Sequence, residues 1–292
     1  MKKFIVLVAA VCMAYTATFA QTVKPFKEGE RAVFLGNSIT DGGHYHSYIW
    51  LYYMTRFPNM PIRIFNGGIG GDTAFDMNKR LDADIFAMQP SVLMVTFGMN
   101  DSGYFEYNGD KAKEFGEEKY QESIKNYQQM EKRFKELPKT RIVMLGTSPY
   151  DETVQLKEGN LFKTKNETIK RIVEYQKESA AKNGWEFSDL NAPMVALNQQ
   201  FQQKDPAFTL CGSDRIHPDN DGHMVMAYLF LKAQGFVGKD VANMEINANK
   251  KEAVKAENCT VSNIKKIGNE LSFDYLAEAL PYPLDTIARG WG

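Results

Sequence analysis

Cysteine is scarce in this sequence. Its 292 residues contain three cysteines, and none of them forms a CxxC pair or stands at zinc-ligand spacing from a histidine. These counts exclude a disulfide framework of the kind that stabilises small secreted domains, and they exclude a structural zinc site. Cys211 and Cys259 could still pair with each other in an oxidising compartment, and the sequence leaves this open.

Long apolar runs and basic runs are missing as well. The apolar segment at residues 4–13 is too short to cross a bilayer as a helix. The formal net charge is −1, and no basic stretch of useful length occurs, so we expect no nucleic-acid partner. Internal repeats and low-complexity stretches are also absent. With 43% apolar residues, the chain can bury one large core, alone or with a small appendage.

The first twenty residues have the pattern of a secretory signal. Two lysines precede the apolar segment, and the small residues Thr18 and Ala20 stand at the cleavage positions before Gln21. We therefore expect residues 1–20 to be a signal peptide. The protein is then exported to the periplasm or the extracellular space, without membrane insertion once the signal has been removed.

Short apolar runs alternate with longer helix-like segments in the next two hundred residues or so. The runs are almost continuously apolar, which is typical of parallel strands covered on both faces. The expected strands are residues 32–35, 62–65, 92–97, 142–145 and 185–188, and the expected helices are about 47–56, 74–88, 117–137, 161–183 and 219–234. This alternation predicts an α/β fold with a doubly wound, mostly parallel five-stranded sheet.

The last part of the sequence has a different pattern. Residues 261–276 read as two strands around Gly268-Asn269, which is a hairpin-type turn. The final residues are punctuated by proline and end without a clear stop signal. We expect a main domain at residues 21–236 and a small C-terminal β-type appendage at residues 237–292, which could be incomplete.

Residues with catalytic chemistry follow three of the expected strands. Ser38 lies in LGNSITDGG after the first strand, Gly71 in NGGIGGDT after the second and Asn100 in FGMND after the third. A further element, DRIHP with Asp214 and His217, directly precedes the last expected helix. Because open α/β sheets bind ligands at the carboxyl ends of their strands, we expect these residues to converge at one edge.

Ser38 could be a helix N-cap or a nucleophile, and its surroundings favour the nucleophile. A serine hydroxyl needs a base to take its proton, and His217 can do so near neutral pH. Asp214 is a local candidate to fix the tautomer of that imidazole. The developing oxyanion needs preorganised donors. The backbone N–H groups of Ser38 and Gly71 and the side-chain amide of Asn100 are the candidates.

The four elements GNSIT, NGGIGGDT, GMND and DRIHP resemble those of the SGNH (GDSL-like) hydrolases, and they occur in the order of that family. The resemblance implies a three-layer α/β/α fold of flavodoxin-like type. It also implies ester hydrolysis through an acyl-enzyme on Ser38, with Asp214 and His217 completing the triad and without metal or cofactor. Asn37 stands where many members have aspartate, but its similar shape still allows it to cap the turn.

Aromatic residues crowd the loops near these elements. Aromatic rings can cover the apolar faces of sugars, so Tyr104 and Tyr150 are candidates for a carbohydrate platform, with His44 at the pocket mouth. The loops at residues 101–119 and 149–160 are too polar to suit a long lipid chain. We therefore expect an exported serine esterase that removes acetyl or similar small groups from an acylated small molecule or polysaccharide.

Other interpretations are weaker but remain open. A lipolytic or broad-specificity carboxylesterase would share the same residues, and a secreted carbohydrate-binding protein could retain the fold without catalysis. A dinucleotide loop is disfavoured because Thr73 replaces the third glycine of the fingerprint. The histidines His44 and His46 lack a third metal ligand nearby in the sequence. The oligomeric state is not indicated.

Overall fold

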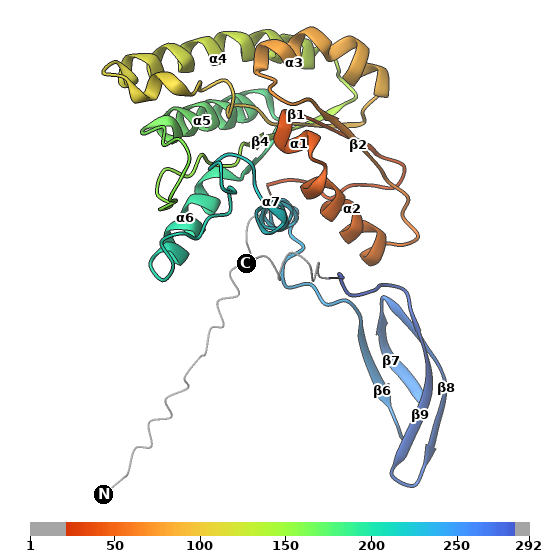
Figure 1. Cartoon of the computed structure of the whole chain (residues 1–292). Helices are drawn as coiled ribbons and strands as arrows, with labels where there is room; N and C mark the ends of the chain where they lie inside the picture. The colour runs from red at the N-terminus through yellow and green to blue at the C-terminus, as the bar shows by residue number, and fades with distance from the viewer. Residues whose placement is uncertain (1–21, 284–292) are drawn as a thin grey trace, which may run out of the picture.

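The computed structural model describes residues 22–283. The predicted signal peptide and residues 284–292 therefore lie outside the described part. At its centre is a parallel sheet of five strands in the order β2-β1-β3-β4-β5 (Figure 1). The strands are β1 (Arg31–Gly36), β2 (Arg63–Gly68), β3 (Val92–Val95), β4 (Arg141–Gly146) and β5 (Glu186–Asp189). This order is the flavodoxin-like one, and it confirms the predicted fold class.

The register of the sheet aligns the carboxyl ends of its strands. In β1, Val33 pairs with Phe65 of β2 on one side and with Leu93 of β3 on the other. Strand β2 lies on one side of β1, whereas β3, β4 and β5 follow on the other side. The direction in which strands are added to the sheet therefore reverses at β1. In open α/β sheets this reversal opens a crevice at the carboxyl ends.

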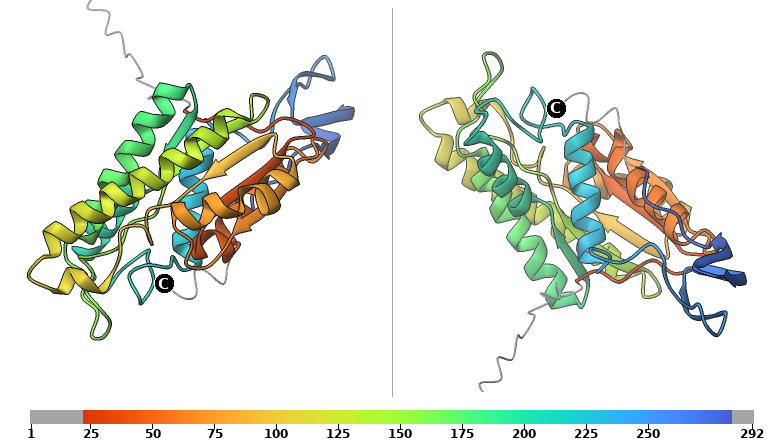
Figure 2. Two further views of the ribbon diagram at one scale, coloured as in Figure 1. Left: turned by 90° about the horizontal axis from the view of Figure 1, so that it is seen from above. Right: turned by 90° about the horizontal axis from the view of Figure 1, so that it is seen from below.

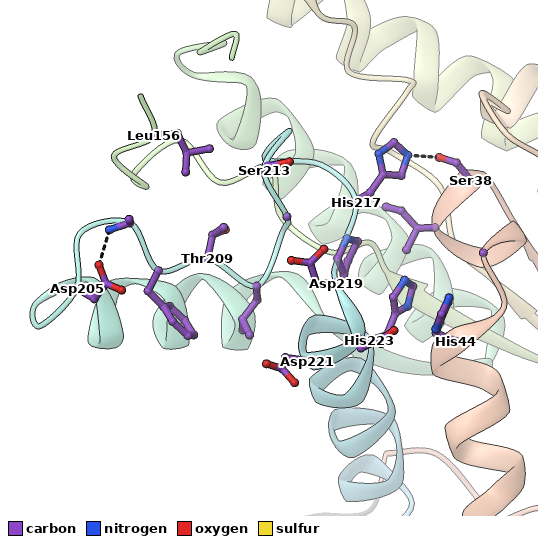
Figure 3. Close-up of a pocket in the computed structure, with 18 residues that line it drawn as sticks. Ser38, His44, Leu156, Asp205, Thr209, Ser213, His217, Asp219, Asp221 and His223 are labelled. Carbon is purple, nitrogen blue, oxygen red and sulfur yellow. Dashed lines mark hydrogen bonds between the residues drawn. The ribbon is translucent and has the colours of Figure 1, made fainter. Parts of the chain in front are cut away.

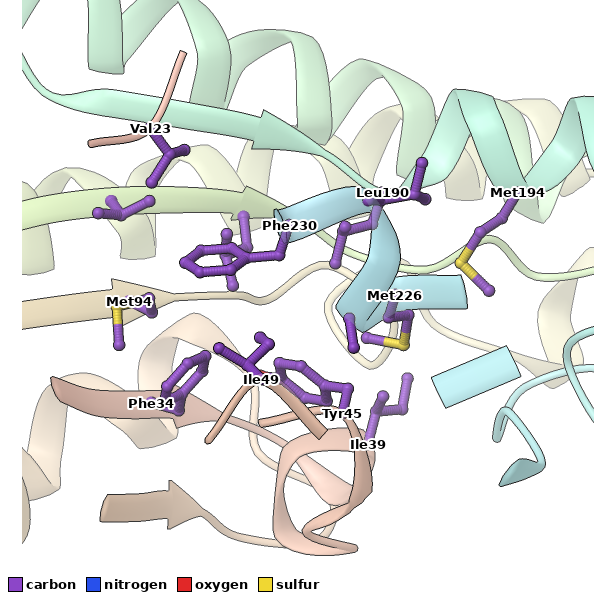
Figure 4. Close-up of a cluster of buried hydrophobic side chains, with 14 of the residues drawn as sticks. Val23, Phe34, Ile39, Tyr45, Ile49, Met94, Leu190, Met194, Met226 and Phe230 are labelled. Atoms are coloured by element: carbon purple, nitrogen blue, oxygen red, sulfur yellow. The ribbon is translucent and has the colours of Figure 1, made fainter. Parts of the chain in front are cut away.

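Helices cover both faces of the sheet (Figures 1 and 2). The helices are α1 (Ser38–Asp41), α2 (His44–Arg56), α3 (Ala74–Arg80), α4 (Ala112–Lys135), α5 (Lys165–Asn183), α6 (Asn191–Gln202) and α7 (Asn220–Ala233). One buried cluster joins the sheet to α2, α6 and α7 through side chains such as Phe34, Ile49, Met194 and Phe230 (Figure 4). A second cluster joins the other face to α3, α4 and α5.

Helix α4 begins at Ala112, earlier than expected, and the short helix α1 was not among the expected helices. Two further segments differ in kind from the prediction. The expected helix at residues 74–88 is α3 followed by a π-helical turn (Leu81–Ile85) and a 3-10 turn (Phe86–Met88). Helix α6 was not predicted, because its amide residues hide the apolar pattern and Pro193 suggests a break. Pro193 lies in the first helical turn, where a missing N–H removes no hydrogen bond.

The tail forms two antiparallel hairpins that project beyond the layer of α2 and α7 (Figure 1). The predicted pair is β8 (Cys259–Ile267) with β9 (Glu270–Ala277), and its turn contains Gly268 at φ +59°. The pair β6 (Asn243–Asn247) with β7 (Glu252–Glu257) was not predicted. Their side chains are mostly exposed, so the apolar pattern that marks buried strands is weak here.

Cys211 and Cys259 are both free thiols in the structure, and both are buried. The pairing that the sequence left open therefore does not occur. No helix within residues 22–283 has the length and apolar character needed to traverse a bilayer.

Candidate active site

Ser38 is the first residue of α1 rather than its cap. The cap is Asn37, whose side-chain oxygen accepts the backbone N–H of Ile39 at 3.1 Å. Asn37 is 2% exposed, so this local hydrogen bond is well shielded from water. Because Asn37 satisfies the start of the helix, the hydroxyl of Ser38 is available for another partner. Its Oγ lies 2.7 Å from Nε2 of His217 (Figure 3).

Asp214 holds the other side of the His217 ring. Its Oδ2 lies 2.6 Å from Nδ1 of His217, and its Oδ1 accepts the backbone N–H groups of Ile216 and His217 at 2.8 and 2.9 Å. Nδ1 thus donates to the carboxylate, while Nε2 accepts the proton of Ser38. The structure brings together the three residues that the sequence predicts as a triad.

The pKa values of His217 and Asp214 are shifted in opposite directions. The hydrogen bond to Asp214 raises the pKa of His217, and partial burial offsets some of this rise. Partial burial alone would raise the pKa of Asp214, but the hydrogen bonds from His217 and Ile216 lower it overall. Asp214 is therefore ionised at neutral pH, ready to stabilise a protonated imidazole.

The loop that carries this pair is fixed by a buried arginine. Arg215 has φ +67°, which is uncommon for a residue other than glycine. Its guanidinium donates to the carbonyls of Asp151 and Val154 at 3.2 and 2.8 Å, and its own carbonyl accepts the N–H of Asp151. Asp151 in turn accepts the hydroxyl of Thr209 at 2.7 Å. The loop after β4 thereby holds the His217 loop in place.

The loop that carries Gly71 contacts the side chain of Asn100 through the neighbouring residue Asp72. Gly71 has φ +83° in an exposed turn after β2, a conformation that favours glycine. The amide nitrogen of Asn100 donates to the carbonyl of Asp72 at 3.0 Å, so the two loops lie in contact. A primary amide has two hydrogens, and this bond uses one of them. The predicted oxyanion donors are thus placed on adjoining loops.

Arg80 connects the strand ends beneath these loops. Its Nε donates to the carboxylate of Asp72 at 2.6 Å, and its Nη2 donates to the carbonyls of Gly67 and Gly36 at 2.8 and 3.2 Å. The sequence did not single out Arg80. Two of its partners are backbone carbonyls 13 and 44 residues away, for which no local pattern exists.

Asp101 is buried and structural. Its two carboxylate oxygens accept the N–H groups of Ala74 and Gly98, both at 2.9 Å. Burial raises its pKa, and these hydrogen bonds oppose the rise. The carboxylate thus joins the turn after β3 to the start of α3.

The three predicted substrate-binding residues have different positions. His44 is exposed at the start of α2, and its ring stacks on His223 with centroids 5.1 Å apart. Tyr104 is half-buried, and its hydroxyl donates to Oδ1 of Asn100 at 2.5 Å. For Tyr150 the expectation must be corrected. It is 1% exposed, and its hydroxyl bonds the backbone of Asn160 and Phe162, so its ring offers no face to a sugar.

A cavity of about 630 Å³ opens beside Ser38 and His217 (Figure 3). Among the described residues that line it are three carboxylates and no lysine or arginine; the carboxylates belong to Asp205, Asp219 and Asp221. His223 also lines it. Burial lowers the pKa of His223 to about 3, so its ring is neutral at ordinary pH. Apolar side chains line it as well, so the pocket is acidic and of mixed polarity.

His46 does not share a ligand site with His44. Its ring is buried, and its Nε2 lies 3.3 Å from the carbonyl of Thr40. Over residues 22–283, no group of three or more His, Cys, Asp or Glu side chains is arranged to hold a metal ion.

Comparison with known proteins agrees with this geometry. The family model of the GDSL-like Lipase/Acylhydrolase family matches residues 34–225. The acetylxylan esterase of Geobacillus stearothermophilus is 27% identical over 224 residues, which cover 71% of this chain and 95% of that protein. A solved structure of a catalytic mutant of Axe2, an acetylxylan esterase from the same organism, has the same fold, with a TM-score of 0.58 at 24% identity. The match covers 72% of this chain and 96% of that one.

A more similar solved structure is that of BT4096, a gut microbial diltiazem-metabolizing enzyme. It is 85% identical, with a TM-score of 0.88, and the match covers 94% of this chain. The present chain spans 62% of the length of that solved chain. The family match covers more than half of the present sequence and confirms the resemblance to SGNH hydrolases. The chain therefore belongs to the GDSL-like lipase/acylhydrolase family, and its matched region is a carboxylic ester hydrolase domain.

Proposed function

We propose that this protein is a serine esterase that removes acetyl groups from carbohydrate. The observation that carries the proposal is the continuous hydrogen-bonded series of Ser38, His217 and Asp214, with contacts of 2.7 and 2.6 Å. It lies at the edge of an open, acidic pocket. A hydroxyl so placed can lose its proton to the imidazole as it attacks a carbonyl.

The proposed reaction has two halves. Oγ of Ser38 attacks the ester carbonyl carbon while its proton passes to Nε2 of His217, and the Asp214 carboxylate stabilises the imidazolium. The N–H groups of Ser38 and Gly71 and the amide of Asn100 hold the oxyanion. The ester C–O bond then breaks, and the alcohol leaves with the proton from His217. Water repeats these steps on the acyl-enzyme, releasing acetate and restoring Ser38.

The nature of the pocket supports a small acyl group on a polar alcohol. Its lining includes aspartate, histidine, serine and threonine side chains, which can bind hydroxyl groups, beside apolar side chains that can contact the acyl group. The relative from Geobacillus stearothermophilus is an acetylxylan esterase, which favours carbohydrate over lipid. Export through a signal at residues 1–20 belongs to the same proposal, because acetylated polysaccharides lie outside the cell.

A second candidate substrate class is acetylated small molecules. It is favoured by the 85% identity to a diltiazem-metabolizing enzyme. Three carboxylates without a basic side chain among the described pocket residues would favour an ester of a cationic alcohol over an ester of an anionic one. One active site can serve both classes, because the carboxylates and hydroxyls bind cations and sugar hydroxyls alike.

A fluorophosphonate probe tests the catalytic assignment. We expect the native protein to be labelled at Ser38 and Ser38→Ala to remain unlabelled, because only an activated serine attacks the probe. Ser213→Ala, which changes another serine in the pocket lining, is the matched control and should label normally. A folded native protein that takes up no probe would favour a non-catalytic binding protein instead.

Acetate release then separates the substrate classes. Acetylated xylo-oligosaccharides, diltiazem and a p-nitrophenyl ester series of increasing chain length would be compared by kcat/KM. Rapid release from the sugar supports the first candidate, and release from diltiazem alone supports the second. A preference that grows with chain length would contradict both and indicate a lipolytic enzyme.

A further inference from the structure

A fully buried lysine lies directly under the loop that carries Asn100. Lys165 is the first residue of α5, and its side chain is 0% exposed. Lysine is almost never fully buried unless its ammonium group is paired, because charge is costly to remove from water. Burial accordingly lowers the pKa of Lys165 to about 7, while Asp101 and Glu152 oppose the fall.

The ammonium group donates all three of its hydrogens to one turn. Nζ bonds the carbonyl of Met99 at 2.7 Å, the hydroxyl of Ser102 at 2.6 Å and the carbonyl of Gly103. These three residues flank Asn100. A turn held at three points by one cation loses most of its freedom to shift, and Asn100 shares that rigidity.

Lys165 reaches the Asn100 side chain by a second route. Its Nζ lies 3.9 Å from the centroid of the Tyr104 ring, which is cation–π distance. The hydroxyl of the same ring donates to Oδ1 of Asn100 at 2.5 Å. With Oδ1 engaged by Tyr104 and one N–H engaged by Asp72, the amide plane of Asn100 is fixed from both ends.

We propose that Lys165 is a positioning residue for ester hydrolysis, which holds the Asn100 amide at the oxyanion through Tyr104 and the turn at residues 99–103. The proposal rests on the assignment of Asn100 to the oxyanion hole in the proposed function. An oxyanion donor is effective only when its geometry is set before the reaction, since reorganisation during the reaction costs free energy. Lys165 supplies that preorganisation without touching the substrate.

The test is a double-mutant cycle between Lys165 and Asn100. Lys165→Met keeps the length of the side chain but removes the ammonium group. With p-nitrophenyl acetate we expect kcat to fall by about 10- to 100-fold, less than the ~10²- to 10³-fold loss for Asn100→Ala. KM should stay within about twofold. Lys177→Met, on the exposed face of the same helix, is the matched control and should keep native kcat.

Coupling between the two sites decides the question. In the Asn100→Ala background, Lys165→Met should lower kcat by less than about twofold, because the amide on which Lys165 acts is gone. An equal loss in both backgrounds would show that Lys165 only supports the fold, and would overturn the proposal. So would native kcat in folded Lys165→Met.

Tyr104→Phe provides a second cycle that does not depend on Lys165→Met folding. It removes only the hydroxyl that holds Oδ1 of Asn100 and keeps the ring under the ammonium group. We expect about a 3- to 10-fold loss of kcat, absent in the Asn100→Ala background. A loss that persists there would contradict the proposed route. If Asn100→Ala alone kept native kcat, the oxyanion assignment of the proposed function would be the part that fails.

Discussion

Within single residues of the site, one polar atom stabilises the local structure while another is available for the proposed reaction. Asn37 caps α1, so the Ser38 hydroxyl need not do so. In Asp214, one carboxylate oxygen fixes the loop by accepting two backbone N–H groups, and the other orients His217. In Asn100 the oxygen and one N–H are held by the protein, which directs the remaining hydrogen. Each reacting group is thus oriented before a substrate arrives.

The residue-scale prediction concerns Asp214→Asn. We expect kcat to fall by about 10³- to 10⁴-fold, because an amide cannot stabilise the imidazolium and favours the wrong tautomer. The hydrogen bond to Asp214 is the largest cause of the raised pKa of His217, so that pKa should fall in the variant. Protonated His217 cannot accept the proton of Ser38. Activity therefore rises with pH through this pKa, and the acid limb should move to lower pH.

The measurement is acetate release as a function of pH for the native protein and for Asp214→Asn. Asp205→Asn, a carboxylate of the same pocket on an exposed loop, is the control and should leave the acid limb in place. An unchanged acid limb in Asp214→Asn would mean that His217 is not the titrating base.

At the scale of elements, α1 rests directly on β2. A Cβ placed on Gly68 would lie 2.2 Å from the backbone nitrogen of Asp41 and 2.7 Å from the carbonyl carbon of Thr40. Both atoms belong to the backbone of α1, which begins with Ser38. Only glycine permits this close approach, so a side chain at position 68 must push α1, and Ser38 with it, away from the sheet.

We accordingly expect Gly68→Ala to lower kcat by at least about tenfold and to lower the free energy of unfolding by about 1–3 kcal/mol. The loss follows from displacement of Ser38 relative to His217. Gly70→Ala is the control from the same loop, because its Cβ would meet only the side chain of Asp41 at 3.9 Å. Urea unfolding and initial rates measure both effects. Native kcat in Gly68→Ala would show that α1 and β2 can separate without harm.

At the scale of the whole molecule, the tail returns to the main domain after its hairpins. The N–H of Leu280 donates to the carbonyl of Thr55 at 2.8 Å, and the ring of Tyr282 packs near Tyr52 of α2. There it borders an apolar cavity of about 470 Å³ between α2 and α7, which Phe236 also lines. These contacts fasten the C-terminal part of the described chain to the helical layer.

We expect Tyr282→Ala to lower the free energy of unfolding by about 1–3 kcal/mol, since a half-buried ring is lost from this contact. The kcat value should stay within about twofold, because Tyr282 packs against Tyr48 and Tyr52 of α2 and Met224 of α7. Tyr275→Ala, at an exposed tyrosine of β9, should leave the Tm unchanged and serves as the control. A native Tm in Tyr282→Ala would show that this contact does not stabilise the protein.

The sequence by itself determined the fold class, the five parallel strands and the residues that meet at their ends. Its apolar runs and its four short motifs are local patterns, and such patterns can be recognised in the sequence without knowledge of the structure. Tertiary structure alone decided the rest. Ser38 and His217 are 179 residues apart, and no spacing rule sets their 2.7 Å contact. Lys165 binds backbone carbonyls of a distant turn, and Arg80 binds those at the ends of two strands; neither partner can be recognised from the sequence around these residues.

The aromatic residues show the same division. The sequence shows that tyrosines are frequent near the four motifs, but it does not predict the orientation of each ring. Tyr150 turned inward because the backbone of residues 160–162 pairs with its hydroxyl, and Tyr104 turned to Asn100. Burial and hydrogen bonding over long distances settle such orientations. The sequence gives the residues that are available for a site, and their packing in the folded protein determines which of them face the substrate.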